Sequence, residues 1–117
     1  MGVALCSRAR VTTAVPRRGE VWLADLPGDK IRPIVVMTRS VIVRHLRSVI
    51  AAPVTSRVRH IPSEVALSND EGLVRDSVAN FDNLQLVART HLIRRVGVLS
   101  RAKLVQACLA LTHAVDC

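Results

Sequence analysis

The sequence of 117 residues predicts a mainly β domain, a small barrel or curled sheet, that ends in one α-helix. Three observations predict this class. Short apolar stretches recur about every ten residues between turn-forming residues, which is the spacing of a small all-β domain. The apolar period changes to that of a helix after Ser100. Half of the residues are apolar, which is enough at this length for one modest core.

The first three predicted strands lie in the amino-terminal half. Residues 19–26 follow a glycine and alternate loosely between apolar and polar side chains. Residues 32–37 form a buried strand whose second position is a proline, tolerated where the ladder has barely begun. Residues 40–46 predict a short helical turn. Residues 47–56 predict the third strand, and Pro53 is expected to make it an edge strand or to introduce a bulge.

The next strands are predicted between residues 61 and 100. Residues 61–67 alternate cleanly, with the odd-numbered side chains inward and Glu64 outward. Residues 70–87 hold one or two strands after the turn signal Glu71–Gly72. Residues 90–100 form a further extended stretch. The total is five to seven short strands.

The carboxy-terminal segment predicts a helix that begins after Ser100, a residue type that caps helix amino termini. One apolar stripe at helical spacing is expected to pack on the barrel: Leu104, Cys108, Leu111 and Val115. Residues 1–16 lack periodicity and predict a flexible tail, so residues 17–117 are expected to form a single domain.

The charge of the chain predicts a polyanionic partner. The formal net charge is +8, and 15 of the 17 basic residues are arginine, whose planar fork matches phosphate. RNA, DNA and an acidic protein all fit. Aromatic side chains are scarce, so a nucleic acid would be held by arginines and backbone groups rather than by base stacking. Trp22 is interpreted as a core residue of the first strand.

Composition argues against several other classes. The three cysteines show no CxxC spacing, so neither a disulfide framework nor a metal site is predicted. No apolar run approaches the ~18 residues that a membrane helix needs. The first residues fit neither a signal peptide nor a myristoylation motif. These features predict a soluble cytoplasmic protein that needs no cofactor.

The residues themselves suggest one candidate site. No Gly-rich phosphate loop, HExxH motif or nucleophile elbow is present, and the four histidines share no recognisable spacing. Arg32 begins one predicted strand and Thr55 ends another, so neighbouring antiparallel strands would bring them to one edge of the sheet. A guanidinium beside a hydroxyl suits a phosphodiester. On spacing alone, a rim arginine and a strand-end cap remain the simpler interpretation.

A family resemblance adds to this pair. Six successive stretches from about Arg18 onward resemble, in order and spacing, the motifs of the MazF/PemK family, the endoribonuclease toxins of bacterial toxin–antitoxin modules. The stretches are RRGEVWLADL, IRPIVVMT, IAAPVTSR, IPSEVAL, GLVRDSVANFDNL and RRVGVLS. Arg32 falls on the RP arginine of the family and Thr55 on its strand-end threonine. The resemblance implies that these two residues are catalytic.

The resemblance implies further properties. They are an SH3-like barrel of the MazF/CcdB type, a homodimer, and metal-independent cleavage of single-stranded RNA at a short sequence. Cleavage would leave a 2′,3′-cyclic phosphate and a 5′-hydroxyl and would inhibit translation and growth. The implied partner is an antitoxin with an acidic, disordered tail. Residues near the predicted pair are expected to bind RNA: Lys30, Ser56, Arg57, Arg59 and His60.

The sequence leaves alternatives open. A gyrase-poisoning toxin of the same fold and a non-catalytic nucleic-acid-binding barrel both remain possible, although Arg32 and Thr55 favour the nuclease. The turn before Arg32 has only five residues, shorter than in the family, and no role is assigned to Gln85 or Arg89. Ordinary roles are expected elsewhere: turn or interface hydrogen bonds for Asp76 and Ser77, a solvated or arginine-bracing Glu20, and a solvated or contact-forming Arg94–Arg95 pair.

Overall fold

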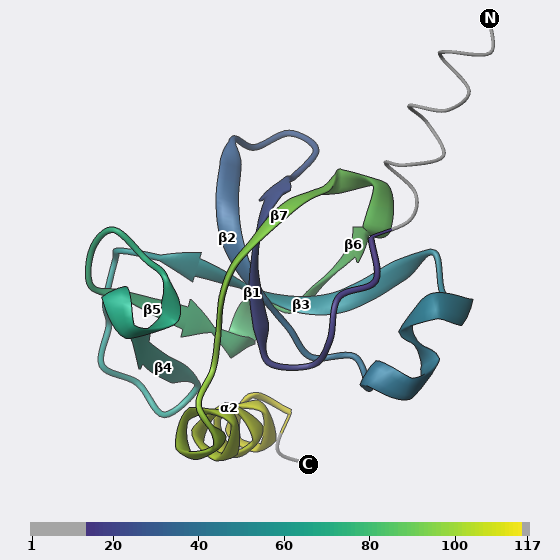
Figure 1. Cartoon of the computed structure of the whole chain (residues 1–117). Coiled ribbons are helices and arrows are strands. Elements are labelled where there is room, and N and C mark those ends of the chain that lie inside the picture. The colour runs from purple at the N-terminus through teal and green to yellow at the C-terminus, as the bar shows by residue number, and fades with distance from the viewer. Residues whose placement is uncertain (1–13, 116–117) are drawn as a thin grey trace, which may run out of the picture.

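The computed structural model describes residues 14–115, which fold into a curled antiparallel sheet crossed at one end by a helix (Figure 1). The tail predicted over residues 1–16 therefore lies almost entirely outside the described residues. The strands are β1 (Glu20–Asp25), β2 (Ile31–Val36), β3 (Ser48–Thr55), β4 (Glu64–Leu67), β5 (Ser77–Asn80), β6 (Gln85–Ala88) and β7 (Leu92–Val98). The helices are the 3-10 turns η1 (Ser40–His45), η2 (Asn69–Glu71), η3 (Phe81–Asn83) and η4 (Arg89–His91), and the α-helix α2 (Arg101–Ala114).

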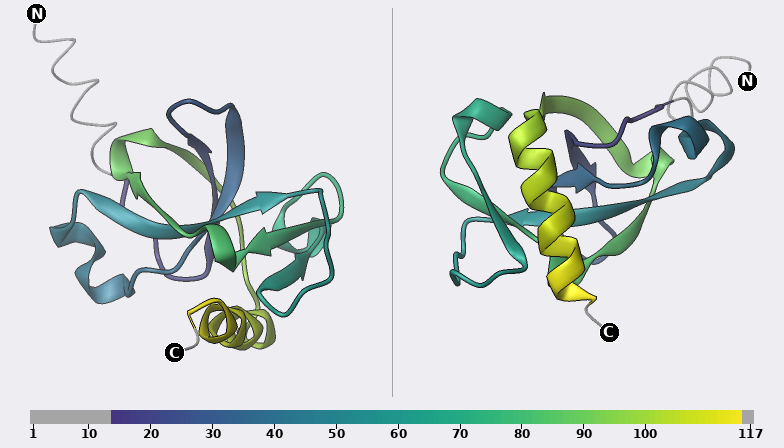
Figure 2. Two further views of the ribbon diagram at one scale, coloured as in Figure 1. Left: turned by 180° about the vertical axis from the view of Figure 1, so that it is seen from behind. Right: turned by 90° about the horizontal axis from the view of Figure 1, so that it is seen from below.

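The strands follow the order β4-β5-β3-β2-β1-β7, and β6 also pairs with β3. This arrangement confirms the predicted class, a mainly β barrel-like fold with a carboxy-terminal helix. Figure 2 shows α2 lying across one end of the curled sheet. Within residues 14–115, no helix is long and apolar enough to span a membrane.

The core has two parts. The part between the sheet and α2 includes Val21, Val35, Phe81, Leu99 and Ala107. The part at the other end of the barrel includes Ala24, Ile34, Val43, Val49 and Val87. Both parts draw on β1, β2 and β3, because alternate residues of a strand face opposite sides of the sheet. The two clusters thus hold both ends of β3 in place.

The prediction that Pro53 makes its strand an edge is wrong, because β3 is the most connected strand of the sheet. The backbone of Ile50 faces the β2 side, since its N–H donates to Thr38 Oγ1 (2.7 Å) and its carbonyl accepts from Met37 N (2.8 Å). Pro53, three residues on, therefore turns its nitrogen to the opposite side. There β6 pairs only as far as Ala51 and β5 begins at Val54, so the missing N–H falls where the partner strand changes.

The helix begins as predicted, and its packed face includes Leu104 and Leu111 of the predicted stripe but not Cys108 or Val115. Ser100 Oγ accepts the N–H of Lys103 at 3.1 Å, which confirms the N-cap. The buried residues are Ala107 and Ala110, with half-buried Leu104, Leu111 and Ala114 beside them, whereas Cys108 and Val115 are exposed. The predicted burial of Cys108 and Val115 is wrong because small alanines, rather than larger side chains, allow the close approach of α2 to the sheet.

Glu20 forms a buried network at the start of β1. Only 7% of the residue is exposed. Oε1 accepts from Arg17 N (2.8 Å) and Trp22 Nε1 (3.0 Å), and Oε2 accepts from Arg95 Nη1 (3.2 Å). The arginine-bracing alternative is therefore correct for Glu20. Trp22 packs against the second part of the core but is only half-buried, so the prediction that it is a core residue is confirmed in part.

Candidate active site

Arg32 and Thr55 lie at the same edge of the sheet. Strands β2 and β3 are antiparallel with Ile34 opposite Pro53, and continuing this register by two residues places Arg32 opposite Thr55. Both residues line one pocket of about 380 Å³. The strand-end geometry expected from the sequence is therefore present, while the catalytic roles of the two residues stay a prediction.

The Arg32 side chain is anchored by an acidic residue of the preceding turn. Its Nε lies 3.1 Å from Asp29 Oδ2, and its Nη2 donates to Asp29 Oδ1 at 3.4 Å. The Nε atom is shielded from solvent and is not aligned with any acceptor among residues 14–115. A quarter of the Arg32 side chain is exposed, Arg32 lines the pocket, and within residues 14–115 its Nη1 donates no hydrogen bond.

Asp29 stays ionised at neutral pH. The backbone N–H of Lys30 donates to Asp29 Oδ1 at 2.7 Å, and this bond, together with the nearby Arg32, holds the pKa of the Asp29 carboxyl below its usual value. At a pH above this lowered pKa, the Asp29 carboxylate is charged and attracts Arg32. The attraction is lost only when the pH falls below the lowered pKa of Asp29. The short turn before β2 thus orients the arginine.

Thr55 ends β3, where it pairs with Val78 of β5. Its Oγ1 accepts the backbone N–H of Arg57 at 3.2 Å, a local turn that fixes the side chain. A hydroxyl that accepts one hydrogen bond still has a proton to donate. The half-buried Thr55 side chain can therefore offer this donor to a ligand in the pocket.

The remaining pocket wall is basic and hydroxylic. Lys30 and Ser56, both predicted to contact RNA, line this pocket, and so do Arg75 and Ser77 from the segment before β5. No aspartate or glutamate is among the lining residues that the structure describes. Arg75 was not predicted, because its position in an exposed loop after η2 carries no local signal.

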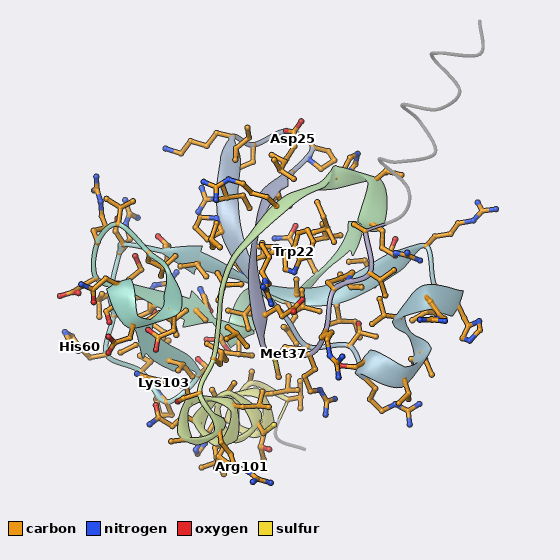
Figure 3. The ribbon with its side chains drawn as sticks, in the orientation of Figure 1. Trp22, Asp25, Met37, His60, Arg101 and Lys103 are labelled. Atoms are coloured by element: carbon orange, nitrogen blue, oxygen red, sulfur yellow. The ribbon has the colours of Figure 1, made fainter. Side chains whose placement is uncertain are left out.

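The structure does not bring the other predicted RNA contacts into this pocket. Arg57 follows Ser56 in the sequence, but it is exposed and does not line the pocket. The backbone N–H groups of Arg59 and His60 donate to Glu64 Oε1 at 3.0 and 3.1 Å. Glu64, expected to point outward, is half-buried because of this loop. His60 has a positive φ of 58° and lies at the outer edge of the molecule beside β4 (Figure 3).

A second cavity adjoins the first through Ser77. This cavity has about 420 Å³ and is lined in part by His60, Glu64, Asp76 and Lys103. The Ser77 hydroxyl donates to Arg75 O at 3.1 Å, the turn role expected for it. Over residues 14–115, no three His, Cys, Asp or Glu side chains are grouped so that they could hold a metal ion.

Comparison with known proteins places the chain in a family. Residues 17–115 match the model of the PemK-like, MazF-like toxins of type II toxin-antitoxin systems. The chain belongs to this family. Probable endoribonuclease MazF5 of Mycobacterium tuberculosis is 37% identical, over 90% of this chain and 97% of the relative. Probable endoribonuclease MazF2 of the same species is 38% identical, over 86% of this chain and 99% of the relative.

Solved structures agree with this assignment. Mycobacterium tuberculosis toxin MazF-mt6 superposes with a TM-score of 0.79 and 34% identity, covering 83% of this chain and 96% of that protein. A mycobacterial endoribonuclease in complex with its cognate antitoxin gives a TM-score of 0.77 and 27% identity, covering 86% and 94%. The MazF-type fold predicted from the sequence is confirmed.

Proposed function

We propose that this MazF-family chain is the toxin of a toxin–antitoxin module and a metal-independent endoribonuclease of single-stranded RNA. The observation that carries the proposal is the meeting of Arg32 and Thr55 in one pocket with a basic lining. The curated relatives MazF5 and MazF2 are named probable endoribonucleases, which supports the reaction class. Cleavage of cellular RNA in the cytoplasm would stop translation and growth.

The pocket suits transesterification of a phosphodiester. The 2′-oxygen of the ribose forms a bond to phosphorus and loses its proton to solvent water. The bond from phosphorus to the 5′-oxygen breaks, and that oxygen takes a proton from solvent water, which leaves a 2′,3′-cyclic phosphate and a 5′-hydroxyl. Negative charge grows on the non-bridging oxygens, where the Arg32 donors stabilise it. Arg32 remains protonated and is therefore an electrostatic group rather than a base.

The other pocket residues have supporting roles in this proposal. The Thr55 hydroxyl donates to a phosphate oxygen and so orients the group for in-line attack. Asp29 holds the Nε and Nη2 side of the Arg32 fork, which leaves Nη1 and the second N–H of Nη2 for the phosphate. Lys30 and Arg75 line the same pocket, and in this proposal they contact neighbouring phosphates.

The partners follow from charge and from the solved relatives. A net charge of +8 fits an acidic, disordered antitoxin tail as well as RNA. One structural relative was solved with its cognate antitoxin, and we propose the same kind of partner for this chain. We also propose that the chain acts as a homodimer, as the family resemblance implies. The antitoxin tail would cover the pocket that holds Arg32.

One assay separates the nuclease from its alternatives. Purified protein is incubated with a long single-stranded RNA in EDTA, and the products are mapped. The proposal expects discrete fragments with 2′,3′-cyclic phosphate ends, and no cutting where the ribose at the site is 2′-deoxy. Intact RNA together with inhibited gyrase supercoiling would instead identify a gyrase poison. A mobility shift without cutting would identify a non-catalytic RNA-binding barrel.

A threonine series tests the proposed hydroxyl. Thr55→Val keeps the shape and removes the donor, and we expect cleavage to fall about 100-fold, because one positioned donor to the reacting phosphate is lost. Thr55→Ser keeps the hydroxyl and should retain most activity. Both rates are measured on the mapped RNA, and thermal melting checks the fold. Equal rates for the valine and serine variants would contradict the role of the hydroxyl.

A further inference from the structure

A second basic pocket lies at the opposite end of β3 from Thr55. It has a volume of about 500 Å³ and occupies the angle between the end of η1, the start of β3 and the end of β6. In Figure 1, η1 (blue) and the β4–β5 pair lie toward opposite ends of β3. The residues that line this pocket are Arg44, His45, Leu46, Arg47, Ala88, Arg89 and Thr90.

Arg89 builds this pocket. Its backbone N–H donates to Arg47 O at 2.8 Å and continues the pairing of β6 with β3. Its Nη1 donates to the carbonyls of Leu46 (3.1 Å), Arg44 (3.3 Å) and Val43 (3.4 Å), and its Nε to Ala14 O at 2.6 Å. Arg89 thus caps the carbonyl end of η1 and holds the loop from residue 44 to 47 in one conformation. Carbonyl oxygens satisfy its donors without neutralising its charge.

The pocket carries positive charge that no carboxylate offsets. The sequence contains no aspartate or glutamate between Asp29 and Glu64, or between Asp82 and Asp116. Arg44 and Arg47 are exposed, and neither forms an ion pair within residues 14–115. Three arginines therefore surround a concave surface, where they raise the local concentration of a polyanion.

We propose that this pocket, defined here as the η1 pocket, binds the phosphate backbone of the RNA substrate away from the cleavage site. The inference rests on the proposed nuclease function. Arginine forks match phosphate geometry. The exposed side chains of His45 and Leu46 line the same pocket, where the imidazole ring can stack on a base.

The position of the η1 pocket predicts a dependence on RNA length. The eight residues of β3 separate it from Thr55 by roughly 25 Å at the usual rise of a strand. A short RNA that fills the Arg32–Thr55 pocket does not reach the η1 pocket, whereas a longer strand occupies both. The second contact strengthens binding without regard to base sequence, because phosphates carry no sequence information.

The test replaces the side chains of the two exposed arginines, Arg44 and Arg47. Their backbone carbonyls stay in place and can still accept hydrogen bonds from Arg89. The Arg44→Ser/Arg47→Ser variant is compared with Arg101→Ser on α2, an exposed arginine that lines neither basic pocket (Figure 3). The substrates share the mapped cleavage site and are roughly 5 or roughly 20 nucleotides long, which spans common single-strand site sizes. Thermal melting verifies that all variants fold.

We expect the double variant to cleave the long RNA about 10-fold more slowly at limiting concentration and the short RNA at the wild-type rate. With a 2′-deoxy, uncleavable long RNA, the slope of log affinity against log salt should fall in magnitude by about 1.4, since two phosphate contacts of about 0.7 each are lost. Arg101→Ser should affect both lengths equally and slightly.

Three results would overturn the inference. The first is an equal loss of cleavage rate on the short and the long RNA. The second is a double variant whose rates and salt slope equal those of Arg101→Ser. The third is a double variant that no longer binds a polyglutamate peptide but keeps its RNA affinity, which would assign the pocket to an acidic protein. The binding arm does not depend on catalysis. If the wild-type protein never cleaves RNA, but the double variant shows a smaller salt slope than the wild type, the proposed nuclease function is wrong. The proposal that the η1 pocket binds RNA then still stands.

Discussion

Replacing Arg32 by lysine is expected to slow RNA cleavage by about 100-fold or more, although the positive charge is kept. Removal of one positioned donor from a developing oxyanion typically has an effect of this size. The guanidinium holds Asp29 with Nε and Nη2 and still presents its other donors to the pocket. A lysine ammonium is one point charge and cannot do both. Arg32→Ala should lose at least as much.

The measurement is the initial rate on the mapped RNA in EDTA. Arg101→Lys on α2 is the matched control, because it makes the same exchange at an exposed site far from the pocket lining. Circular dichroism and melting temperature establish that each variant is folded. Near-wild-type cleavage by Arg32→Lys would exclude a two-pronged contact and leave Arg32 as a rim charge.

Gly97→Ala is expected to destabilise the fold by about 3 kcal/mol or more, at or above the upper end of the usual cost of overpacking, because the obstructing atoms cannot move aside. A Cβ at residue 97 would lie 2.0 Å from the carbonyl oxygen of Glu71 and 2.5 Å from its carbonyl carbon. The contact is reciprocal, since a Cβ at Gly72 would lie 2.0 Å from Val96 O. Both obstacles are backbone, so η2 and β7 would have to separate.

Urea or thermal unfolding measures the effect, and a loss of this size should lower the melting temperature by at least about 10 °C. Gly28→Ala is the control: its φ of 76° strains an alanine, but a Cβ there meets nothing within 4 Å, so about 1 kcal/mol is expected. A melting temperature of Gly97→Ala within a few degrees of wild type would show that η2 moves freely.

This glycine contact bears on the candidate active site. The chain leaves η2 at Gly72 and continues through Leu73, Arg75 and Ser77, all of which line the Arg32–Thr55 pocket. A shift of η2 away from β7 would therefore displace one wall of the pocket. We expect any folded fraction of Gly97→Ala to cleave RNA more slowly than its folded concentration predicts.

Short-range sequence patterns were sufficient to predict most of the secondary structure and the candidate catalytic pair. Apolar periodicity located the strands and α2, and Ser100 marked the helix start, because both signals depend on residues within a few positions of each other. Arg32 and Thr55 could be paired from the sequence for a related reason. Each stands at the end of an apolar run, and neighbouring antiparallel strands bring such ends together.

Long-range packing decided the remainder. The central place of Pro53 depends on where β6 stops and β5 starts, and the buried face of α2 depends on how closely its alanines approach the sheet. Arg75 and Arg89 gain their positions from η2 packing on β7 and from the carbonyls of η1. The residues next to a side chain in the sequence do not predict such contacts, because the contacts form only when distant segments of the chain pack together.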